Sequence, residues 1–281
     1  MQTPQTVVFH GIEAVRLQTP DGAVAIVALH GAQVLSWLPA GGTEQLFLSE
    51  RADFSSGAAI RGGVPVIFPQ FAERGPGLRH GFARRQRWRE IDRRQAENHA
   101  CVTFRLEADE ATHALWPHAF ALELTIMIEG RRLDIELEVF NPGQESFQFT
   151  AALHTYLRLG NVELARLEGL EGLEYLEASQ AGRRMRDERY ALLVDDEVDR
   201  IYLRAARPLL LSEPTRQLAI EQSGFTDVVV WNPWQERCAT LPDMAPLDFR
   251  RMLCVEAGTI AEPVLLPAGE DWYGRQTLVA L

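Results

Sequence analysis

Lysine is absent from the sequence, so all 28 of its basic residues are arginine. This absence excludes mechanisms that depend on a lysine amine, namely Schiff-base catalysis, pyridoxal phosphate linkage and phosphate binding by a P-loop lysine. The dinucleotide-binding, hydrolase and metalloprotease patterns G-x-G-x-x-G, G-x-S-x-G and H-E-x-x-H are missing as well. Several common enzyme classes are therefore excluded.

Cysteine is scarce, and the three that occur are single and widely spaced: Cys101, Cys238 and Cys254. Such a set predicts no disulfide framework, and the C-x-x-C pair of most zinc sites is missing. Two of the three lie in apolar runs and are interpreted as core thiols. His113 and His118 have no other metal-ligating residues beside them, so we expect neither a metal nor a cofactor.

Long apolar runs are also missing. No run reaches the roughly 18 residues that a membrane-spanning helix needs. Residues 1–6 do not combine a basic region with a following apolar region, so no secretory signal is predicted. We therefore expect a cytoplasmic protein without a membrane partner.

Alternation of apolar and polar residues predicts β-structure along the whole chain. Residues 120–128 and 132–140 alternate strictly around Gly130, which predicts a hairpin with one buried and one wet face. Further strands are expected at 23–29, 33–38, 99–107, 147–157, 162–167, 200–203, 207–211, 216–221, 226–231, 252–256 and 272–280. Helical periodicity is poor, and only 51–54 and about 234–250 look able to form short helices.

Strands that recur about every eight to twelve residues are typical of a large antiparallel sandwich. No linker, internal repeat or change in composition divides the chain, so one domain over residues 1–281 is expected. The rigid aromatic segment 231–234 is interpreted as packing at the edge of this sandwich.

Charge is distributed unevenly along this acidic chain, whose formal net charge is −11. Residues 61–94 contain nine arginines but only three acidic residues, a local charge of +6, which leaves −17 for the remainder. A confined basic segment fits a small anion better than a nucleic acid, which needs an extended basic face. A solvated arginine-rich loop is the alternative interpretation.

Two titratable residues lie in otherwise apolar strands, His154 in 151–156 and Glu256 in 252–258. Burial of such groups costs several kcal/mol unless they are paired or used. Opening a cyclic hemiacetal requires a base for the anomeric hydroxyl and an acid for the ring oxygen, and a carboxylate and an imidazolium suit these tasks. Their opposite charges would stabilise one another. Taken singly, a histidine in such a strand is more often structural, and a carboxylate at a strand end is more often exposed to solvent.

An irregular loop is predicted over residues 60–71, which contain two glycines and two prolines. Arg61 precedes the glycine pair, and Arg79 and Arg84 follow the loop. Guanidinium groups match phosphate bidentately, so these three arginines could converge on a phosphate.

Six segments, taken in order over residues 60–256, resemble the aldose 1-epimerase superfamily and specifically its hexose-6-phosphate mutarotase branch. They are Arg61-Gly-Gly-Val-Pro65, His80-Gly-Phe-Ala-Arg84 with Trp88, His154-Thr-Tyr156 leading to Glu168-Gly-Leu170, Val198-Asp-Arg-Ile-Tyr202, Phe225-Thr-Asp-Val-Val-Val-Trp-Asn-Pro233 and Cys254-Val-Glu256. The resemblance implies an all-β fold, a galactose-mutarotase-like antiparallel β-supersandwich with a few short helices.

The resemblance also implies roles for individual residues. His154 matches the catalytic acid and Glu256 the catalytic base, whereas Asp199 matches a carboxylate that binds sugar hydroxyls. Arg61 and Arg84 match substrate-binding arginines, most simply for the 6-phosphate. Two neighbours complete the set of expected substrate-binding residues: Arg79, at a position often filled by a neutral amide, and His80.

The expected function is the cofactor-free interconversion of the α and β anomers of a small phosphorylated hexose, with glucose 6-phosphate as the expected substrate. A monomer or a weak homo-oligomer is expected, with no nucleic-acid partner. Two alternatives stay open at this point. The same fold could bind a sugar phosphate without turning it over, or it could act on an unphosphorylated aldose.

Overall fold

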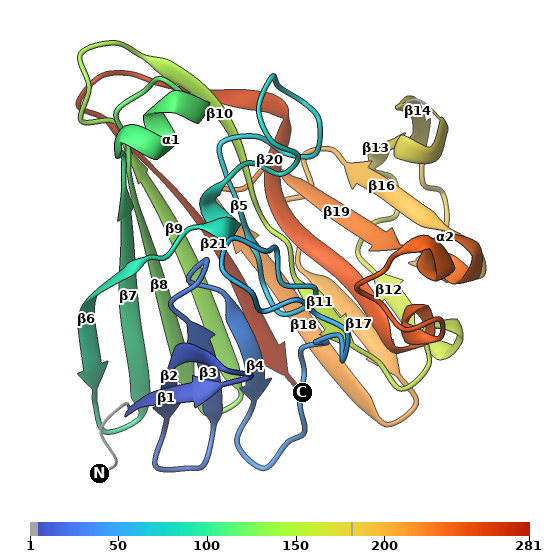
Figure 1. Ribbon diagram of the computed structural model, residues 1–281. Helices are drawn as coiled ribbons and strands as arrows, with labels where there is room; N and C mark the ends of the chain where they lie inside the picture. Colours follow the sequence, from blue (N-terminus) through green and yellow to red (C-terminus); the bar gives the residue numbers. More distant parts are fainter. Residues whose placement is uncertain (1–4, 181) are drawn as a thin grey trace.

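Antiparallel sheets form most of the chain in the computed structural model, which describes residues 5–180 and 182–281 (Figure 1). Within these residues the smallest sheet has the order β1 (Gln5–Phe9), β2 (Ile12–Gln18), β3 (Val24–Ala28) and β4 (Val34–Leu38). The nine-stranded sheet has the order β15 (Ala191–Leu192), β12 (Arg166–Glu168), β17 (Leu209–Glu213), β18 (Arg216–Ser223), β21 (Asp271–Ala280), β9 (Arg132–Phe140), β8 (Ala121–Glu129), β7 (His99–Glu107) and β6 (Arg89–Gln95).

An eight-stranded sheet lies beside them, at the right of Figure 1. Its order is β14 (Arg183–Arg186), β13 (Glu174–Glu177), β16 (Val198–Tyr202), β19 (Asp227–Asn232), β20 (Met252–Leu266), β10 (Phe147–Leu153) and β5 (Val66–Ile67), and β11 (Tyr156–Arg158) also pairs with β20. The helices are short: α1 (Glu110–Leu115), α2 (Trp234–Thr240) and the 3-10 turns η1 (Ala83–Arg85), η2 (Val162–Leu164), η3 (Ala178–Gln180) and η4 (Asp248–Arg251).

The predicted all-β class is confirmed, and the strictly alternating hairpin forms as β8 and β9. Two local predictions are wrong. Residues 51–54 form no helix, because Arg51 belongs to a turn and residues 52–54 are irregular. The strand expected at 162–167 begins with η2, because the Asn161 side chain accepts a hydrogen bond from the Glu163 backbone N–H. The helix expected at about 234–250 divides into α2 and η4.

Several elements were not predicted, namely β1, β2, β5, β6, β13, β14, β15 and α1. Some of these strands are very short, and β14 and β6 lie at sheet edges, where exposed side chains blur the apolar alternation. In α1 a capping box between Asp109 and Thr112 marks the helix start.

The strands of the eight-stranded sheet alternate between a core face and an outer face. On β20, Leu253, Val255 and Ala257 belong to the main hydrophobic cluster, which contains residues from all three sheets. Cys254 and Glu256 therefore point to the opposite face. The same alternation places other side chains on that outer face: His154, Tyr156, Asp199, Ile201, Val229 and Trp231.

Loops between β4 and η1 rise over this outer face and depend on close backbone approaches (Figure 1). The chain turns at Phe68-Pro69, a cis peptide bond, and Phe68 bridges to Gly81. Gly81 has a φ of +66°, and a Cβ there would lie 1.9 Å from the Phe68 carbonyl oxygen. Only glycine fits at this position, which fixes the backbone immediately before Arg84.

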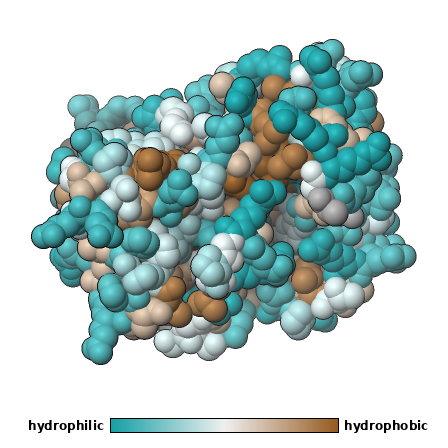
Figure 2. All heavy atoms as spheres, turned by 90° about the horizontal axis from the view of Figure 1, so that it is seen from above, coloured by the Kyte–Doolittle hydropathy of each residue, from teal (hydrophilic) through white to brown (hydrophobic). Residues whose placement is uncertain are grey.

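The view from above in Figure 2 shows a mostly hydrophilic surface, on which apolar residues form separate groups. None of the helices formed by residues 5–180 and 182–281 is both long enough and apolar enough to cross a membrane.

Candidate functional site

A cavity of about 820 Å³ opens on the outer face of the eight-stranded sheet. Its volume lies within the range of about 300–1,000 Å³ that is common for small-molecule sites. Strands β16, β19 and β20 form its floor, and the loops before η1 together with η1 form one wall. All seven residues selected from the sequence line this cavity: Arg61, Arg79, His80, Arg84, His154, Asp199 and Glu256.

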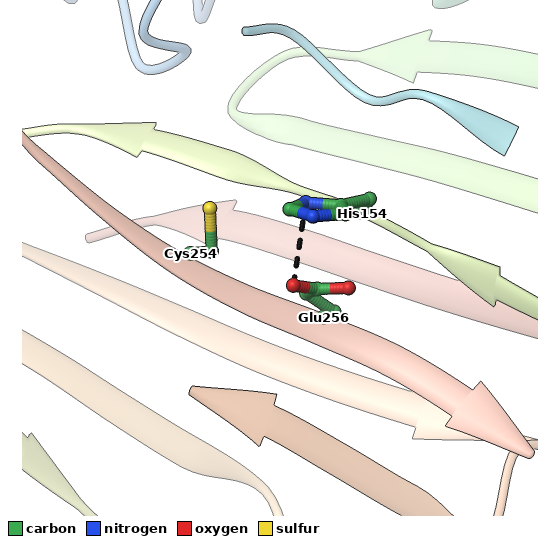
Figure 3. Close-up of side chains that lie close together, drawn as sticks. All are labelled: His154, Cys254 and Glu256. Atoms are coloured by element: carbon green, nitrogen blue, oxygen red, sulfur yellow. Dashed lines mark ion pairs between the residues drawn. The ribbon is translucent and has the colours of Figure 1, made fainter. Parts of the chain in front are cut away.

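His154 and Glu256 face one another on the floor, with 3.3 Å between the imidazole Nδ1 and a carboxylate oxygen (Figure 3). His154 follows β10 at a break before β11, and its N–H donates to the Pro65 carbonyl. Because β10 and β11 both pair with β20, this break places the imidazole beside Glu256. The break is thus the local feature that assembles the pair.

Both side chains are almost fully buried, with exposed fractions of 7% for His154 and 1% for Glu256. His154 Nδ1 and Glu256 Oε2 have no hydrogen-bond partner among the described residues. Leaving buried polar atoms unpaired costs about 1–3 kcal/mol each. Groups kept in this state at the bottom of a cavity are candidates for binding a ligand.

Burial is the main influence on the pKa values of both members of this pair. Burial and the nearby Asp199 charge raise the pKa of Glu256 well above its usual value, although Arg84 opposes the shift. Burial, together with His80, Arg84 and Arg61, lowers the pKa of His154 well below its usual value. Both directions favour the neutral forms near pH 7, which differs from the expected ion pair, because desolvation outweighs the mutual attraction in the protein alone.

Arg84 is a guanidinium without an acidic partner. Its Nη2 donates to the Arg79 carbonyl at 3.1 Å, but its buried Nε has no hydrogen-bond partner, and no carboxylate within residues 5–180 and 182–281 pairs with it. Burial and neighbouring arginines lower the pKa of Arg84 to about 10. A cation with an unused donor, held in a cavity, is suited to an anion.

Arg61, in contrast, already has partners. Its Nε and Nη2 donate to the two carboxylate oxygens of Asp243 at 3.0 and 3.2 Å, and its Nη1 donates to the Tyr156 hydroxyl at 2.9 Å. The two arginines that were expected to bind phosphate therefore differ, because Arg84 keeps a buried Nε donor without a partner among the described residues.

The remaining predicted residues lie around the cavity with different environments. His80 has a φ of +62° and accepts a hydrogen bond at Nδ1 from the Ala72 N–H, at 3.3 Å. Burial and the nearby arginines lower its pKa to about 2, so it is neutral and its other ring nitrogen is a donor. Asp199 lies 3.7 Å from Arg237. Arg79 is exposed and contacts Glu73 at 3.3 Å.

One donor set in the site could hold a metal ion. Ligand atoms of His154, Cys254 and Glu256 lie within 4.8 Å of one another, and nitrogen, sulfur and oxygen donors together suit Zn²⁺ (Figure 3). The Cys254 thiol is fully buried, however, and does not line the cavity. A cation there would also occupy both members of the His154–Glu256 pair.

Among the further residues that line the cavity, Trp231, Arg237 and Asp243 have polar or aromatic groups and were not selected from the sequence. The alternation of β19 would have placed Trp231 on the same face as Val229, so its interpretation as edge packing was wrong. Arg237 lies in α2 and Asp243 lies after it, and no strand pattern indicates there which way a side chain points. Their positions depend on how residues 234–251 fold over the sheet.

Comparison with known proteins identifies relatives over nearly the whole chain. Residues 13–278 match the family model for aldose 1-epimerase. A protein of Cenchrus ciliaris, provisionally named glucose-6-phosphate 1-epimerase, is 34% identical over 96% of this chain and 85% of its own length. A protein of the same provisional name from Escherichia coli K12 is 32% identical over 85% of this chain and 80% of its own. The crystal structure of a provisionally named mutarotase from Salmonella typhimurium superimposes with a TM-score of 0.91, at 28% identity, covering 99% of this chain and 93% of that one.

Replacement of Glu256 by glutamine should stabilise the protein at pH 7.5. Because folding raises the pKa of this carboxyl group, it holds its proton to a higher pH in the folded protein than in the unfolded chain, where it ionises above about pH 4.5, so folding becomes less favourable as the pH rises. We expect Tm to rise by about 2 °C or more at pH 7.5, and the gain to vanish near pH 4. Thermal unfolding at both pH values measures this difference.

His154→Gln should show the opposite pH dependence. The imidazole binds a proton below about pH 6.5 in the unfolded chain but only at lower pH in the folded protein, so the wild type loses stability as the pH falls from 7.5 to 5. The stability of this variant relative to the wild type should therefore rise over the same range. The exposed Glu145→Gln is the matched control, and its Tm should stay close to that of the wild type at every pH. A Glu256→Gln protein that melts below the wild type at pH 7.5 would contradict the neutral pair.

Proposed function

The chain belongs to the aldose 1-epimerase family, and on this premise we propose that it interconverts the α and β anomers of a hexose 6-phosphate, with glucose 6-phosphate as substrate. The observation that carries the proposal is the buried His154–Glu256 pair in the same cavity as Arg84, a guanidinium without a carboxylate partner. The pair suits the anomeric centre and Arg84 suits the phosphate.

Glu256 acts as the base and His154 as the acid in the proposed reaction. The carboxylate takes the proton of the anomeric hydroxyl while the imidazolium gives a proton to the ring oxygen. The bond between C1 and the ring oxygen breaks, which leaves an aldehyde at C1 and a hydroxyl at C5. Rotation about C1–C2 presents the other face of the aldehyde. Ring closure then reverses both transfers, because Glu256 gives its proton to O1 while His154 takes the proton of the C5 hydroxyl.

Substrate binding supplies the hydrogen bonds that this pair lacks. The neutral pair and the ion pair contain the same number of protons, so one proton must move from Glu256 to His154 before ring opening. An anomeric hydroxyl that donates to the carboxylate, and a ring oxygen that accepts from the imidazolium, both favour the charged forms. The neutral pair is also the state that exists once the ring is open, so it is ready to close the ring.

Arg84 binds the 6-phosphate in this proposal. Two features support this role: a buried Nε donor without a hydrogen-bond partner and the absence of a paired carboxylate among the described residues. The names of the relatives, which refer to glucose 6-phosphate, support it as well. Arg85 follows it on η1 and also lines the cavity, so a dianion there would meet two adjacent guanidinium groups. The alternative, an aldose mutarotase for unphosphorylated sugar, has no use for this charge.

Asp199, His80 and Arg79 hold the rest of the sugar in this proposal. Asp199 accepts from sugar hydroxyls, while its charge helps to keep the proton on Glu256 in the protein alone. The neutral His80 donates from its free ring nitrogen. Arg79, exposed at the rim, contributes least because solvent screens it.

Anomer exchange of glucose 6-phosphate, followed by NMR exchange spectroscopy, tests the proposed activity. We expect catalysis by the wild type and a loss of roughly 10²-fold or more in kcat for His154→Asn and for Glu256→Gln, the usual contribution of a positioned acid or base. Tight binding of glucose 6-phosphate without any rate enhancement would instead favour a binding module. Exchange at the wild-type rate in either variant would refute the assigned roles.

Replacement of Arg84 by alanine should raise KM for glucose 6-phosphate by roughly tenfold or more, with a smaller effect on kcat, because a charge-assisted contact to phosphate contributes about 1.5–3 kcal/mol. The same change should leave the slower exchange of glucose nearly unaffected. Arg89→Ala, at an exposed arginine on β6 outside the cavity, is the matched control. Equal kcat/KM of the wild type for glucose and its 6-phosphate would remove phosphate from the proposal.

A further inference from the structure

We propose that Asp243, Arg61 and Tyr156 form a positioning chain that fixes the His154 imidazole, and that Arg61 serves this chain more than it serves the phosphate. The inference rests on the proposed function of the same cavity, because it concerns how the acid is held. None of the three residues needs to touch the reacting atoms, so they are positioning residues.

The first link joins Asp243 to Arg61. The carboxylate accepts from Nε and Nη2 of the guanidinium at 3.0 and 3.2 Å, which is a bidentate arrangement. Both side chains are about three-quarters buried, with exposed fractions of 22% and 25%. A bidentate pair fixes the plane and the direction of the guanidinium, which a single contact does not. Asp243 therefore determines where the third nitrogen of Arg61 points.

The second link joins Arg61 to Tyr156. Arg61 Nη1 donates to the tyrosine hydroxyl at 2.9 Å, and its guanidinium carbon lies 5.9 Å from the centre of the Trp231 ring. Tyr156 is almost fully buried, and its backbone pairs with Cys254 on β20. With the backbone fixed by the sheet and the hydroxyl fixed by Arg61, the phenol ring is held at both ends.

The third link is the contact between the rings of Tyr156 and His154. They stack with centroids 4.7 Å apart and planes inclined by 7°. His80 and Trp231 close two other sides of the imidazole, at 5.5 and 6.2 Å, in edge-on contacts. The parallel contact with Tyr156 is the one that sets the plane of the His154 ring.

Ring packing matters here because hydrogen bonds do not orient this histidine. Catalytic imidazoles are commonly fixed by a hydrogen bond to one ring nitrogen, yet His154 Nδ1 has no such partner in the described part of the chain. A displacement of about 1 Å in a catalytic group can cost as much as 10²-fold in rate. A chain that ends in a stacked phenol replaces the missing hydrogen bond.

Three variants test the chain: Asp243→Asn, Tyr156→Phe and the two combined. Asp243→Asn breaks the bidentate pair, and Tyr156→Phe keeps the ring but removes the hydroxyl that Arg61 holds. Each single variant should lower kcat for glucose 6-phosphate by roughly tenfold, with KM and the inhibition constant of inorganic phosphate changed by less than about twofold. Arg84→Ala should show the reverse split.

The variant that combines Asp243→Asn with Tyr156→Phe distinguishes a chain of dependent contacts from two residues that affect kcat independently. If the two residues act through one route, removing both should lower kcat no further than the more damaging single change does. Losses that multiply would overturn the proposal. Asp243→Glu should recover part of the loss. Asp195→Asn is the matched control, because Asp195 is exposed and does not line the cavity, and its kcat should stay at the wild-type value.

An NMR measurement keeps the inference testable if the protein proves to have no epimerase activity. The ring carbon-bound protons of His154, assigned by their loss in His154→Asn, should shift in Asp243→Asn and Tyr156→Phe but not in Asp195→Asn. Unchanged His154 signals in both chain variants would overturn the positioning role, whatever the activity. Shifted signals without any catalysis would keep the chain and contradict only the proposed function.

Discussion

The contact between His154 and Glu256 depends on a balance between burial and attraction. The two side chains lie 3.3 Å apart at the bottom of a cavity, where burial favours their neutral forms over an ion pair. Solvent water would remove this preference, because it stabilises charge on both groups. The sheet, the loops and the neighbouring aromatic rings all contribute to keeping the pair dry, and the proposed chemistry needs that condition.

The fold keeps the pair buried because the two faces of one sheet have different roles. The core face of the eight-stranded sheet packs into the main hydrophobic cluster, whereas its outer face carries polar and aromatic side chains under a cover of loops. A polar face on a strand whose other face is buried costs stability, but the core face holds the strand in register. The register then places Glu256 opposite Val229, beside the break that presents His154. Rigid strands thus fix the pair more accurately than loops could.

Charge is divided between two tasks in the cavity. Arg61 is tied to Asp243 and Tyr156, and it supports the aromatic side of the site. Among the described residues Arg84 has no acidic partner and keeps an unpaired Nε donor, so its positive charge is available to an anion. The sequence presents both as members of one arginine-rich segment, and only the contacts of each guanidinium distinguish them.

Much of the fold and of the candidate site could be predicted from the sequence, for reasons that particular residues illustrate. Strict alternation identified β8 and β9, and alternation in 147–156 placed His154 and Tyr156 on one face. Short edge strands such as β14 were not predicted, because a few mostly exposed residues show no alternation of apolar and polar side chains. Asp243 could not be found, since its position depends on a turn after α2 and on a partner 182 residues away in sequence. The neutral protonation of the pair also required knowledge of its burial.

The pH dependence of kcat/KM for glucose 6-phosphate tests the buried neutral pair most directly, because this parameter reports the ionisation of the free enzyme. Between pH 7 and 8 the substrate phosphate is almost fully dianionic, since its second pKa is about 6. With the pKa of His154 lowered and that of Glu256 raised, the pair keeps its single proton throughout this range, so kcat/KM should stay level. A decline toward tenfold per pH unit, the behaviour of an acid with the ordinary histidine pKa of about 6.5, would contradict the account.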